Sequence, residues 1–155
     1  MIKISRILVP TDFSELGNLA VEYGAAIAEQ FHSELEILHV IDDYFALAPE
    51  AQLMLPDRHE YLCDLQAAAR AELAKLTATG KHSETHVGRH TTVGRPFEEI
   101  VRFAKEHQID LIVIGSHGRR GISHLLMGSV AERVVRVAGC PVLTVRPDQH
   151  QFVTT

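Results

Sequence analysis

The sequence is poor in cysteine, contains no long apolar run and carries no excess of positive charge. Its two cysteines, Cys63 and Cys140, form neither a CxxC nor a zinc-ligand spacing, so we expect free thiols in a reducing cytosol. No segment reaches the roughly 18 apolar residues that a membrane-spanning helix needs. The stretch from Met1 to Val9 is too short for the apolar core of a secretion signal. These absences predict a soluble, cytoplasmic protein.

The charge balance counts against a nucleic-acid partner. There are 15 Lys and Arg residues against 20 Asp and Glu, a formal net charge of −5, whereas domains that bind nucleic-acid backbones are usually strongly basic. Hydrophobic residues make up 46% of the chain and charged residues 23%, which is typical of a globular rather than a disordered chain. We expect one domain over residues 1–147 and a C-terminal tail over 148–155.

Several well-known site patterns are missing as well. No GxxxxGK[ST] segment is present, so no lysine is fixed against the β- and γ-phosphates as in a P-loop. The first apolar run leads into Pro10-Thr11-Asp12, not into a three-glycine dinucleotide fingerprint. Ser116-His117 and Ser123-His124 are adjacent pairs, and neighbours in sequence seldom form a catalytic dyad. We therefore predict no catalytic residue.

The ten histidines do not predict a metal centre. His86 and His90 would share one face of a strand but lie roughly 13 Å apart, at about 3.3 Å per residue, too far for one zinc ion. We expect His39 to pack within the second strand and His117 to contact a ligand. For the other histidines a surface position is the simpler interpretation.

Apolar runs and amphipathic segments alternate along the chain. Runs typical of buried parallel strands fall at 7–9, 35–41, 111–114 and 142–145, and a weaker alternation at 83–93 indicates a half-exposed edge strand. Between them, apolar residues at helical spacing predict four helices, which begin near Glu15 after a Ser14 cap, near Leu62, at Pro96 and at Ser129. Residues 42–56 have no period and predict a long connection of the kind that forms lids or contact surfaces.

Strands that alternate with helices predict an α/β fold, an open, doubly wound parallel sheet with right-handed crossovers. The run 111–114 is the most apolar, so we expect it to be the central strand. We expect the second helix to end at Gly80 and the fourth near Ala138. The buried face of the first helix is predicted to carry Leu16, Leu19, Ala20, Tyr23, Ile27 and Phe31.

Glycines between the fourth strand and the last helix give the strongest local signal. Gly115, Gly118 and Gly128 follow the spacing G-x2-G-x9-G, and Ser129 comes next. Without a Cβ they let the backbone approach a phosphate closely, the helix start attracts anions, and Arg119 can add a forked charge. Ser129 with Glu three residues on is a capping box, so we expect Ser129 to be the N-cap and that glutamate to point outward. A GxxG pair alone could be an ordinary turn.

The longer spacing resembles the nucleotide-binding signature of the universal stress protein family. The likeness runs through the segments 7–14 (ILVPTDFS), 38–42 (LHVID), 110–121 (DLIVIGSHGRRG), 128–136 (GSVAERVVR) and 140–147 (CPVLTVRP). It implies a Rossmann-like, adenine nucleotide alpha hydrolase-like fold with strand order 3-2-1-4-5. In that order the ends of the first and fourth strands meet at the switch point, where open sheets bind ligands.

The resemblance implies an ATP-binding stress-response protein that acts as a regulatory module, with ADP or AMP as alternatives and Mg²⁺ carried on the phosphates. Asp12 is implied to hydrogen-bond the adenosine and the Val40 backbone to contact adenine. From position alone, Asp12 could serve only as a helix-start residue, and Val40 only as strand core. The nucleotide contacts implied are Pro10, Thr11, Asp12, Val40, Gly115, Ser116, His117, Gly118, Arg119, Gly128, Ser129, Val130 and Ala131.

Other function classes stay open at this point. One is a slow nucleotide hydrolase or nucleotidyl-transfer enzyme on the same scaffold, because phosphoryl transfer needs mainly positioning and electrostatics. Another is a structural stress protein whose loop holds nothing. An unidentified protein partner also fits.

The last strand predicts a homodimer. Val142, Leu143 and Val145 stand at an expected sheet edge, and an apolar, unpaired edge needs a cover. Family members that resemble this chain pair through that strand. The alternative cover is the chain's own tail, 148–155.

Overall fold

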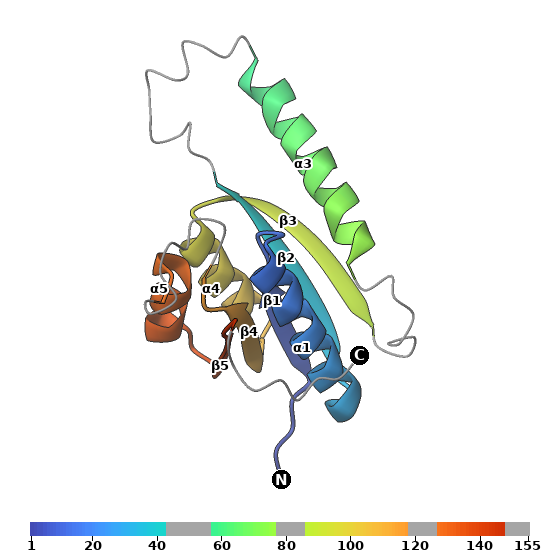
Figure 1. Cartoon of the computed structure of the whole chain (residues 1–155), viewed down its shortest axis with the longest axis vertical. Coiled ribbons are helices and arrows are strands. Elements are labelled where there is room, and N and C mark those ends of the chain that lie inside the picture. Colours follow the sequence, from blue (N-terminus) through green and yellow to red (C-terminus); the bar gives the residue numbers. More distant parts are fainter. Residues whose placement is uncertain (43–56, 77–85, 118–126, 148–155) are drawn as a thin grey trace.

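The computed structural model describes residues 1–42, 57–76, 86–117 and 127–147 (Figure 1). The elements in these ranges are β1 (Arg6–Pro10), α1 (Glu15–Phe31), β2 (Glu34–Asp42), α3 (Arg58–Lys75), β3 (Val87–Gly94), α4 (Pro96–Glu106), β4 (Leu111–Gly115), α5 (Ser129–Val137) and β5 (Val142–Val145). The five strands form one parallel sheet in the order β3-β2-β1-β4-β5. The predicted doubly wound fold and its strand order are confirmed.

Helices cover both faces of the sheet. Successive residues of β1 point to opposite faces, so Ile7 and Val9 join a core cluster with α1 and α3, while Leu8 joins a second cluster with α4 and α5. Figure 1 shows α1 lying across one face and α4 and α5 together on the other side. A sheet covered twice needs apolar side chains at consecutive positions, which explains the continuous apolar runs.

The central strand is β1, and the prediction that residues 111–114 form it was wrong. β4 lies between β1 and β5. Both strands are buried on both faces, with Ile7, Leu8 and Val9 as inaccessible to solvent as Ile112 and Val113. An apolar run therefore indicates that both faces of the sheet are covered at that strand, but it does not indicate the position of the strand in the sheet.

The buried face of α1 is made mostly of small residues, and the predicted stripe of large side chains was only partly right. Tyr23 is buried, but Phe31 is 42% exposed. At Gly24 an added Cβ would lie 2.3 Å from Val9 Cγ2, so the helix lies too close to β1 for larger residues. The Ser14 cap is confirmed, because its side chain accepts a hydrogen bond from the Gly17 N–H.

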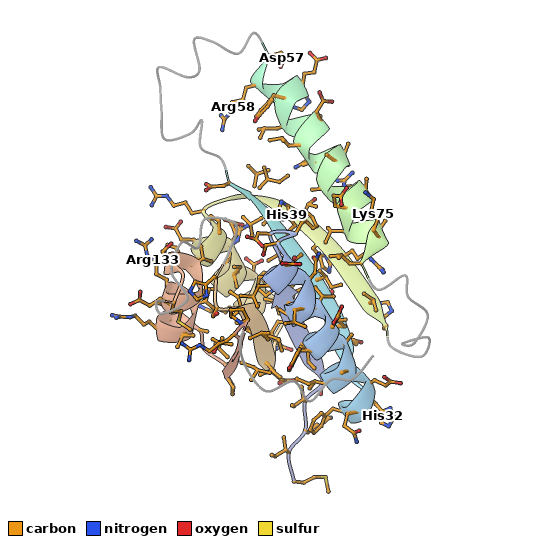
Figure 2. All side chains as sticks on the ribbon, viewed as in Figure 1. His32, His39, Asp57, Arg58, Lys75 and Arg133 are labelled. Carbon is orange, nitrogen blue, oxygen red and sulfur yellow. The ribbon has the colours of Figure 1, made fainter. Side chains whose placement is uncertain are left out.

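Helix α3 is held to the sheet mainly at its C-terminal end. Its only buried residues are Ala69 and Leu73, and Figure 2 shows Asp57 far from the sheet and Lys75 near it. The prediction that this helix runs on to Gly80 was wrong, since it ends at Lys75; position 80 itself lies outside the described residues. Arg89 of β3 donates from Nε to the Leu73 carbonyl and from Nη2 to the Leu76 carbonyl, each over 3.1 Å, which satisfies the last turn of the helix.

The second helix begins at Arg58, four residues before the predicted Leu62, and β3 begins at Val87 instead of at residue 83, whereas the boundaries of α4 and α5 agree closely with the prediction. Pro96 is the first residue of α4, where its missing N–H costs nothing, and α5 ends at Val137, one residue before the expected Ala138. β3 and β5 are the two sheet edges. The expected connection over 42–56 lies, apart from Asp42, outside the described residues.

Both cysteines are free thiols, as predicted. Cys63 is exposed, whereas burial, followed by the negative charge of Asp110, raises the pKa of Cys140 above its usual value. None of the helices in the described ranges combines the length and apolar character needed to cross a bilayer.

Candidate functional site

A pocket of about 710 Å³ lies where β1, β2 and β4 end and α4 and α5 begin. This is the switch point of the sheet, because β1 leads to β2 on one side and neighbours β4 on the other. Gly118 and Arg119 lie outside the described residues. All the other predicted nucleotide contacts line the pocket, namely Pro10, Thr11, Asp12, Val40, Gly115, Ser116, His117, Gly128, Ser129, Val130 and Ala131.

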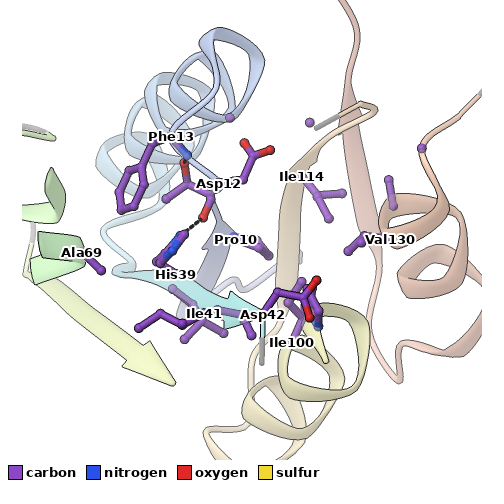
Figure 3. Close-up of a pocket in the computed structure, with 18 of the residues that line it drawn as sticks. Pro10, Asp12, Phe13, His39, Ile41, Asp42, Ala69, Ile100, Ile114 and Val130 are labelled. Carbon is purple, nitrogen blue, oxygen red and sulfur yellow. Dashed lines mark hydrogen bonds between the residues drawn. The ribbon is translucent and has the colours of Figure 1, made fainter. Parts of the chain in front are cut away.

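The pocket extends over the strand ends to both sides of the sheet. Figure 3 shows Phe13, His39 and Ala69 on one side of the β1 end and Ile114 and Val130 on the other. The sequence analysis missed one wall completely, because the α3 residues carry no local signal of their place. The lining residues not predicted are Phe13, Gly17, Leu38, His39, Ile41, Asp42, Leu65, Ala68, Ala69, Glu72, Pro96, Ile100 and Ile114.

The backbone of Val40 faces the pocket because β2 continues beyond its neighbour. β1 ends at Pro10, which pairs with Leu38, and the Thr11 N–H donates to the Leu38 carbonyl over 2.9 Å. In a parallel ladder alternate residues bond to the same neighbouring strand, so the Val40 N–H and C=O point to the same side as those of Leu38. No described strand pairs with that edge of β2 beyond Leu38. A donor and an acceptor from one residue therefore lie side by side in the pocket.

The start of α5 presents a second set of backbone groups. Gly128, with φ −62° and ψ 148°, is the N-cap and Ser129 is the first helical residue, so the prediction that Ser129 caps this helix was wrong by one position. The start is fixed early because the Gly128 carbonyl accepts from the Glu132 N–H over 2.9 Å. Ser129, Val130 and Ala131 thus occupy the first turn, where backbone N–H groups have no partner within the helix.

Ser116 ties the end of β4 to its surroundings through its backbone. Its N–H donates to the Val145 carbonyl over 2.8 Å, and its carbonyl accepts from the Gly128 N–H over 2.7 Å. The second bond brings the N-cap of α5 against the end of β4. The segment that follows Gly115 and the segment that begins at Gly128 therefore lie in contact.

Of the signature glycines that the structure describes, Gly115 is constrained by packing, and Gly128 has no unusual dihedral angle. The φ of Gly128 is one that any residue adopts, which contradicts the idea that a special φ requires glycine at that position. At Gly115 an added Cβ would lie 3.2 Å from both Cγ and the carbonyl oxygen of Leu16. That position is therefore kept small by contact with α1.

Asp12 serves the start of α1 and lines the pocket as well. Its Oδ1 accepts from the Ser14 N–H over 3.1 Å and from the Ser14 hydroxyl over 2.5 Å. The same Ser14 Oγ caps the helix. The helix-start role and the pocket position are thus both present in one carboxylate.

Two histidines line the pocket. His39 does not merely pack within β2: its Nδ1–H donates to the Thr11 carbonyl over 2.8 Å, and its ring stacks on Phe13 with centroids 4.3 Å apart. His117 Nδ1 lies 2.8 Å from the Ser116 hydroxyl. Its Nε2 is buried and has no hydrogen-bond partner in the described part of the chain.

The described pocket lining is rich in negative side chains. Asp12, Asp42 and Glu72 contribute carboxylates, and no Lys or Arg is among the described lining residues. Glu132, expected to point outward, does so and pairs with Arg136 over 2.7 Å. Among the described residues, the groups that can attract an anion in the pocket are therefore backbone N–H groups and not cationic side chains of Lys or Arg. Within the described ranges, no three His, Cys, Asp or Glu side chains are grouped to hold a metal ion.

Comparison with known proteins gives a consistent family. A sequence model of the universal stress protein family matches residues 3–146. Universal stress protein MJ0531 of Methanocaldococcus jannaschii is 32% identical over 94% of this chain and 84% of its own length. Universal stress protein MJ0577 of the same organism is 32% identical over 91% of this chain and 94% of its own.

Solved structures agree with the sequence comparison. The structure of MJ0577 superposes with a TM-score of 0.81 at 30% identity, covering 96% of this chain and all of that one. The crystal structure of a universal stress protein in complex with cAMP has a TM-score of 0.65 at 26% identity, covering 94% of this chain and 98% of that one.

Proposed function

The chain belongs to the universal stress protein family, and from that membership and its pocket we propose that it binds an adenine nucleotide at the carboxyl ends of β1, β2 and β4. The nucleotide is ATP, with ADP or AMP as alternatives. A member of the family whose crystal structure resembles this one holds cAMP. The observation that carries the proposal is the convergence, in one pocket, of the open Val40 edge and the first turn of α5.

The Val40 backbone suits the base. An N–H donor beside a C=O acceptor complements adenine, which offers the N1 acceptor beside the N6 amino group. Guanine carries the opposite order, an O6 acceptor beside the N1–H donor. Pro10, Ile100 and Ile114 supply apolar surface next to this edge, as small-molecule pockets require. Asp12 is proposed to hydrogen-bond the adenosine.

The start of α5 suits the phosphates. Three N–H groups and the positive end of the helix dipole favour a negative group there. The carboxylates of Asp12, Asp42 and Glu72 oppose one, so we propose that the phosphates bind with Mg²⁺, which neutralises part of their charge. Gly118 and Arg119 are proposed to complete the phosphate site.

Titration calorimetry and thermal unfolding of nucleotide-free protein test the proposal. ATP at about a hundred times its dissociation constant should stabilise the fold by roughly 2.7 kcal/mol, on the order of 5–10 °C in melting temperature. GTP should bind more weakly than ATP, and omission of Mg²⁺ should weaken ATP more than AMP. No shift with any adenine nucleotide would contradict the proposal.

A matched pair of variants tests the phosphate site. Ser129→Pro removes one backbone N–H, and proline suits the first helical position after the extended Gly128. Ser129→Ala removes only the hydroxyl. We expect the proline variant to lose roughly tenfold in ATP affinity, the worth of one charge-assisted hydrogen bond, at an unchanged melting temperature. The alanine variant should bind like the parent, and equal affinities in both variants would put the phosphates elsewhere.

We also propose a regulatory rather than an enzymatic role in the stress response, carried by one domain over residues 1–147.

We further propose a homodimer formed by pairing of the β5 edges. β5 is a sheet edge, and an unpaired edge favours pairing with a second copy. Val142 and Leu143 are half-buried, while Val145 is inaccessible within one chain. The backbone of β5, more than the Val145 side chain, would therefore make the contact.

A further inference from the structure

The Ser116 side chain is buried and has one hydrogen-bond partner. Ser116 is 2% exposed, and in the part of the chain that the structure describes its hydroxyl contacts only His117 Nδ1, over 2.8 Å. Both backbone groups of Ser116 are engaged, with Val145 on one side and Gly128 on the other. The hydroxyl is therefore held in place beside the imidazole by bonds that do not involve the ring.

The hydrogen bond between the Ser116 hydroxyl and His117 Nδ1 determines the tautomer of His117. A buried O–H needs an acceptor, and the one beside the Ser116 hydroxyl is the lone pair of His117 Nδ1. If Nδ1 carried the hydrogen instead, the serine proton would have no acceptor there. In a neutral imidazole one nitrogen donates and the other accepts. Nδ1 therefore accepts, and Nε2 carries the hydrogen.

The Nε2–H of His117 is a hydrogen-bond donor without an acceptor among the described residues. The atom is buried without a partner among the described residues, and the residue lines the pocket beside the first turn of α5. A buried donor left unpaired is costly, so an oxygen of a bound ligand would relieve that cost. His117 stands next to Ser116, which bonds to the N-cap of α5. A nucleotide phosphate bound at the start of α5 would lie near His117 and would offer oxygen acceptors to its Nε2–H.

His39 makes the opposite arrangement in the same pocket. A backbone carbonyl can only accept, so the bond from His39 Nδ1 to the Thr11 carbonyl puts the hydrogen on Nδ1. The His39 Nε2 is then an acceptor. A histidine that acts as a general base is usually held in this second way, with Nδ1–H bonded to an acceptor and Nε2 left basic.

We propose that Ser116 is a positioning residue that fixes His117 as a hydrogen-bond donor to an oxyanion in the pocket, and that His117 is thereby built to bind phosphate and not to act as a general base. The identification of the oxyanion as a nucleotide phosphate rests on the proposed function. The tautomer and the role of Ser116 do not.

Nitrogen NMR of histidine-labelled, ligand-free protein tests the tautomer. The His117 signals should belong to the Nε2–H form with Nδ1 accepting a hydrogen bond, and those of His39 to the Nδ1–H form. The variants His117→Gln and His39→Gln assign the signals. In Ser116→Ala, which keeps both backbone bonds, only the His117 Nδ1 signal should move to its unbonded position. A His117 Nδ1–H form, or an unmoved signal in Ser116→Ala, would overturn the proposal.

Titration calorimetry with AMP and adenosine tests the donor role. His117→Gln keeps an N–H donor near the Nε2 position, whereas His117→Leu removes it. AMP affinity should fall roughly tenfold or more in the leucine variant, by much less in the glutamine variant, and adenosine affinity should change in neither. A loss for adenosine equal to that for AMP would overturn the phosphate assignment.

A double-mutant cycle separates positioning from packing. Ser116→Ala should weaken AMP binding in the parent protein and have no further effect in a His117→Gln background, because its action passes through the imidazole. Equal losses in both backgrounds would show a purely structural role and overturn the proposal. If the parent protein binds no adenine nucleotide, the proposed function fails, while the NMR result still decides the tautomer.

Discussion

At the scale of single residues, the same atoms hold the fold and form the pocket. Asp12 Oδ1 supports the Ser14 cap of α1 while its carboxylate lines the pocket. Gly115 keeps α1 close to β4 and lies beside the ligand space. A substitution at either residue is therefore expected to affect both the fold and the pocket.

Gly17 is the residue-scale test of this coupling. It lines the pocket from α1, and an added Cβ would lie 2.9 Å from both Asp12 Oδ1 and Thr11 Oγ1. In Gly17→Ala the carboxylate must move, so we expect ATP affinity to fall roughly tenfold, by loss of its hydrogen bond. Alanine is favoured over glycine in a helix by about 1 kcal/mol, which should offset the crowding in the melting temperature.

Gly139→Ala is the control for this change, because an added Cβ there meets nothing within 4 Å. It should leave ATP binding unchanged in the same calorimetric titration. If Gly17→Ala binds ATP like the control, the position of Asp12 does not matter to the ligand.

The sequence predicted pocket residues correctly where their neighbours in the chain form a recognisable pattern. Asp12 and Ser116 stand within two residues of the ends of apolar strands, and the strand order that joins them came from the family resemblance. Leu65 and Glu72 were missed, because a helix reaches the pocket only through tertiary packing. Sequence reasoning considered Ser116 and His117 only as a catalytic dyad and did not predict the hydrogen bond between their side chains, which lie 2.8 Å apart just after β4.

At the scale of elements, α3 is the part least determined by local pattern. Its sequence fits a longer helix, but the two bonds from Arg89 end it near Leu76. Of the apolar residues whose helical spacing predicts this helix, Leu62, Leu65 and Leu76 are half-buried, while Ala69 and Leu73 are buried. Figure 1 shows the helix leaning away from the sheet. Strand runs and caps are local, whereas the place of a helix depends on partners distant in sequence.

Arg89→Ala should loosen α3 and with it one wall of the pocket. The lost bonds to two carbonyls are worth about 1–2 kcal/mol, and amide exchange should accelerate across residues 58–75 more than in α1. Arg89→Lys, which keeps a charge but can serve fewer acceptors, should fall between the alanine variant and the parent.

Lys75→Ala is the matched control on the same helix. It breaks an exposed pair with Glu72, and such pairs contribute little. Unchanged amide exchange of α3 in Arg89→Ala would show that other contacts hold this wall.

At the scale of the whole molecule, the outer edge of β5, with which no described strand pairs, predicts assembly. The Pro141 carbonyl accepts from Ile112 of β4 and the Val145 carbonyl from Ser116, directly after β4. The alternating Val142 and Thr144 backbones therefore point outward. Proline is tolerated where an edge N–H faces away from the sheet. Thr144→Pro should therefore abolish the homodimer and yield the 17.2 kDa monomer in size-exclusion chromatography with light scattering.

Leu143→Pro is the counterpart that affects the inner side of the strand. It removes an N–H directed at β4 and should lower the melting temperature more than Thr144→Pro does. A monomeric parent protein would contradict the homodimer, and a Thr144→Pro variant that stays dimeric would place the interface away from the β5 edge.

The central claim is that an adenine nucleotide lies across the ends of β1, β2 and β4, and a crystal structure of the nucleotide complex tests it most directly. The account predicts the adenine edge on the Val40 N–H and C=O, and phosphate oxygens on the N–H groups of Ser129, Val130 and Ala131. A nucleotide bound elsewhere on the molecule, or in this pocket with its phosphates turned away from α5, would contradict it.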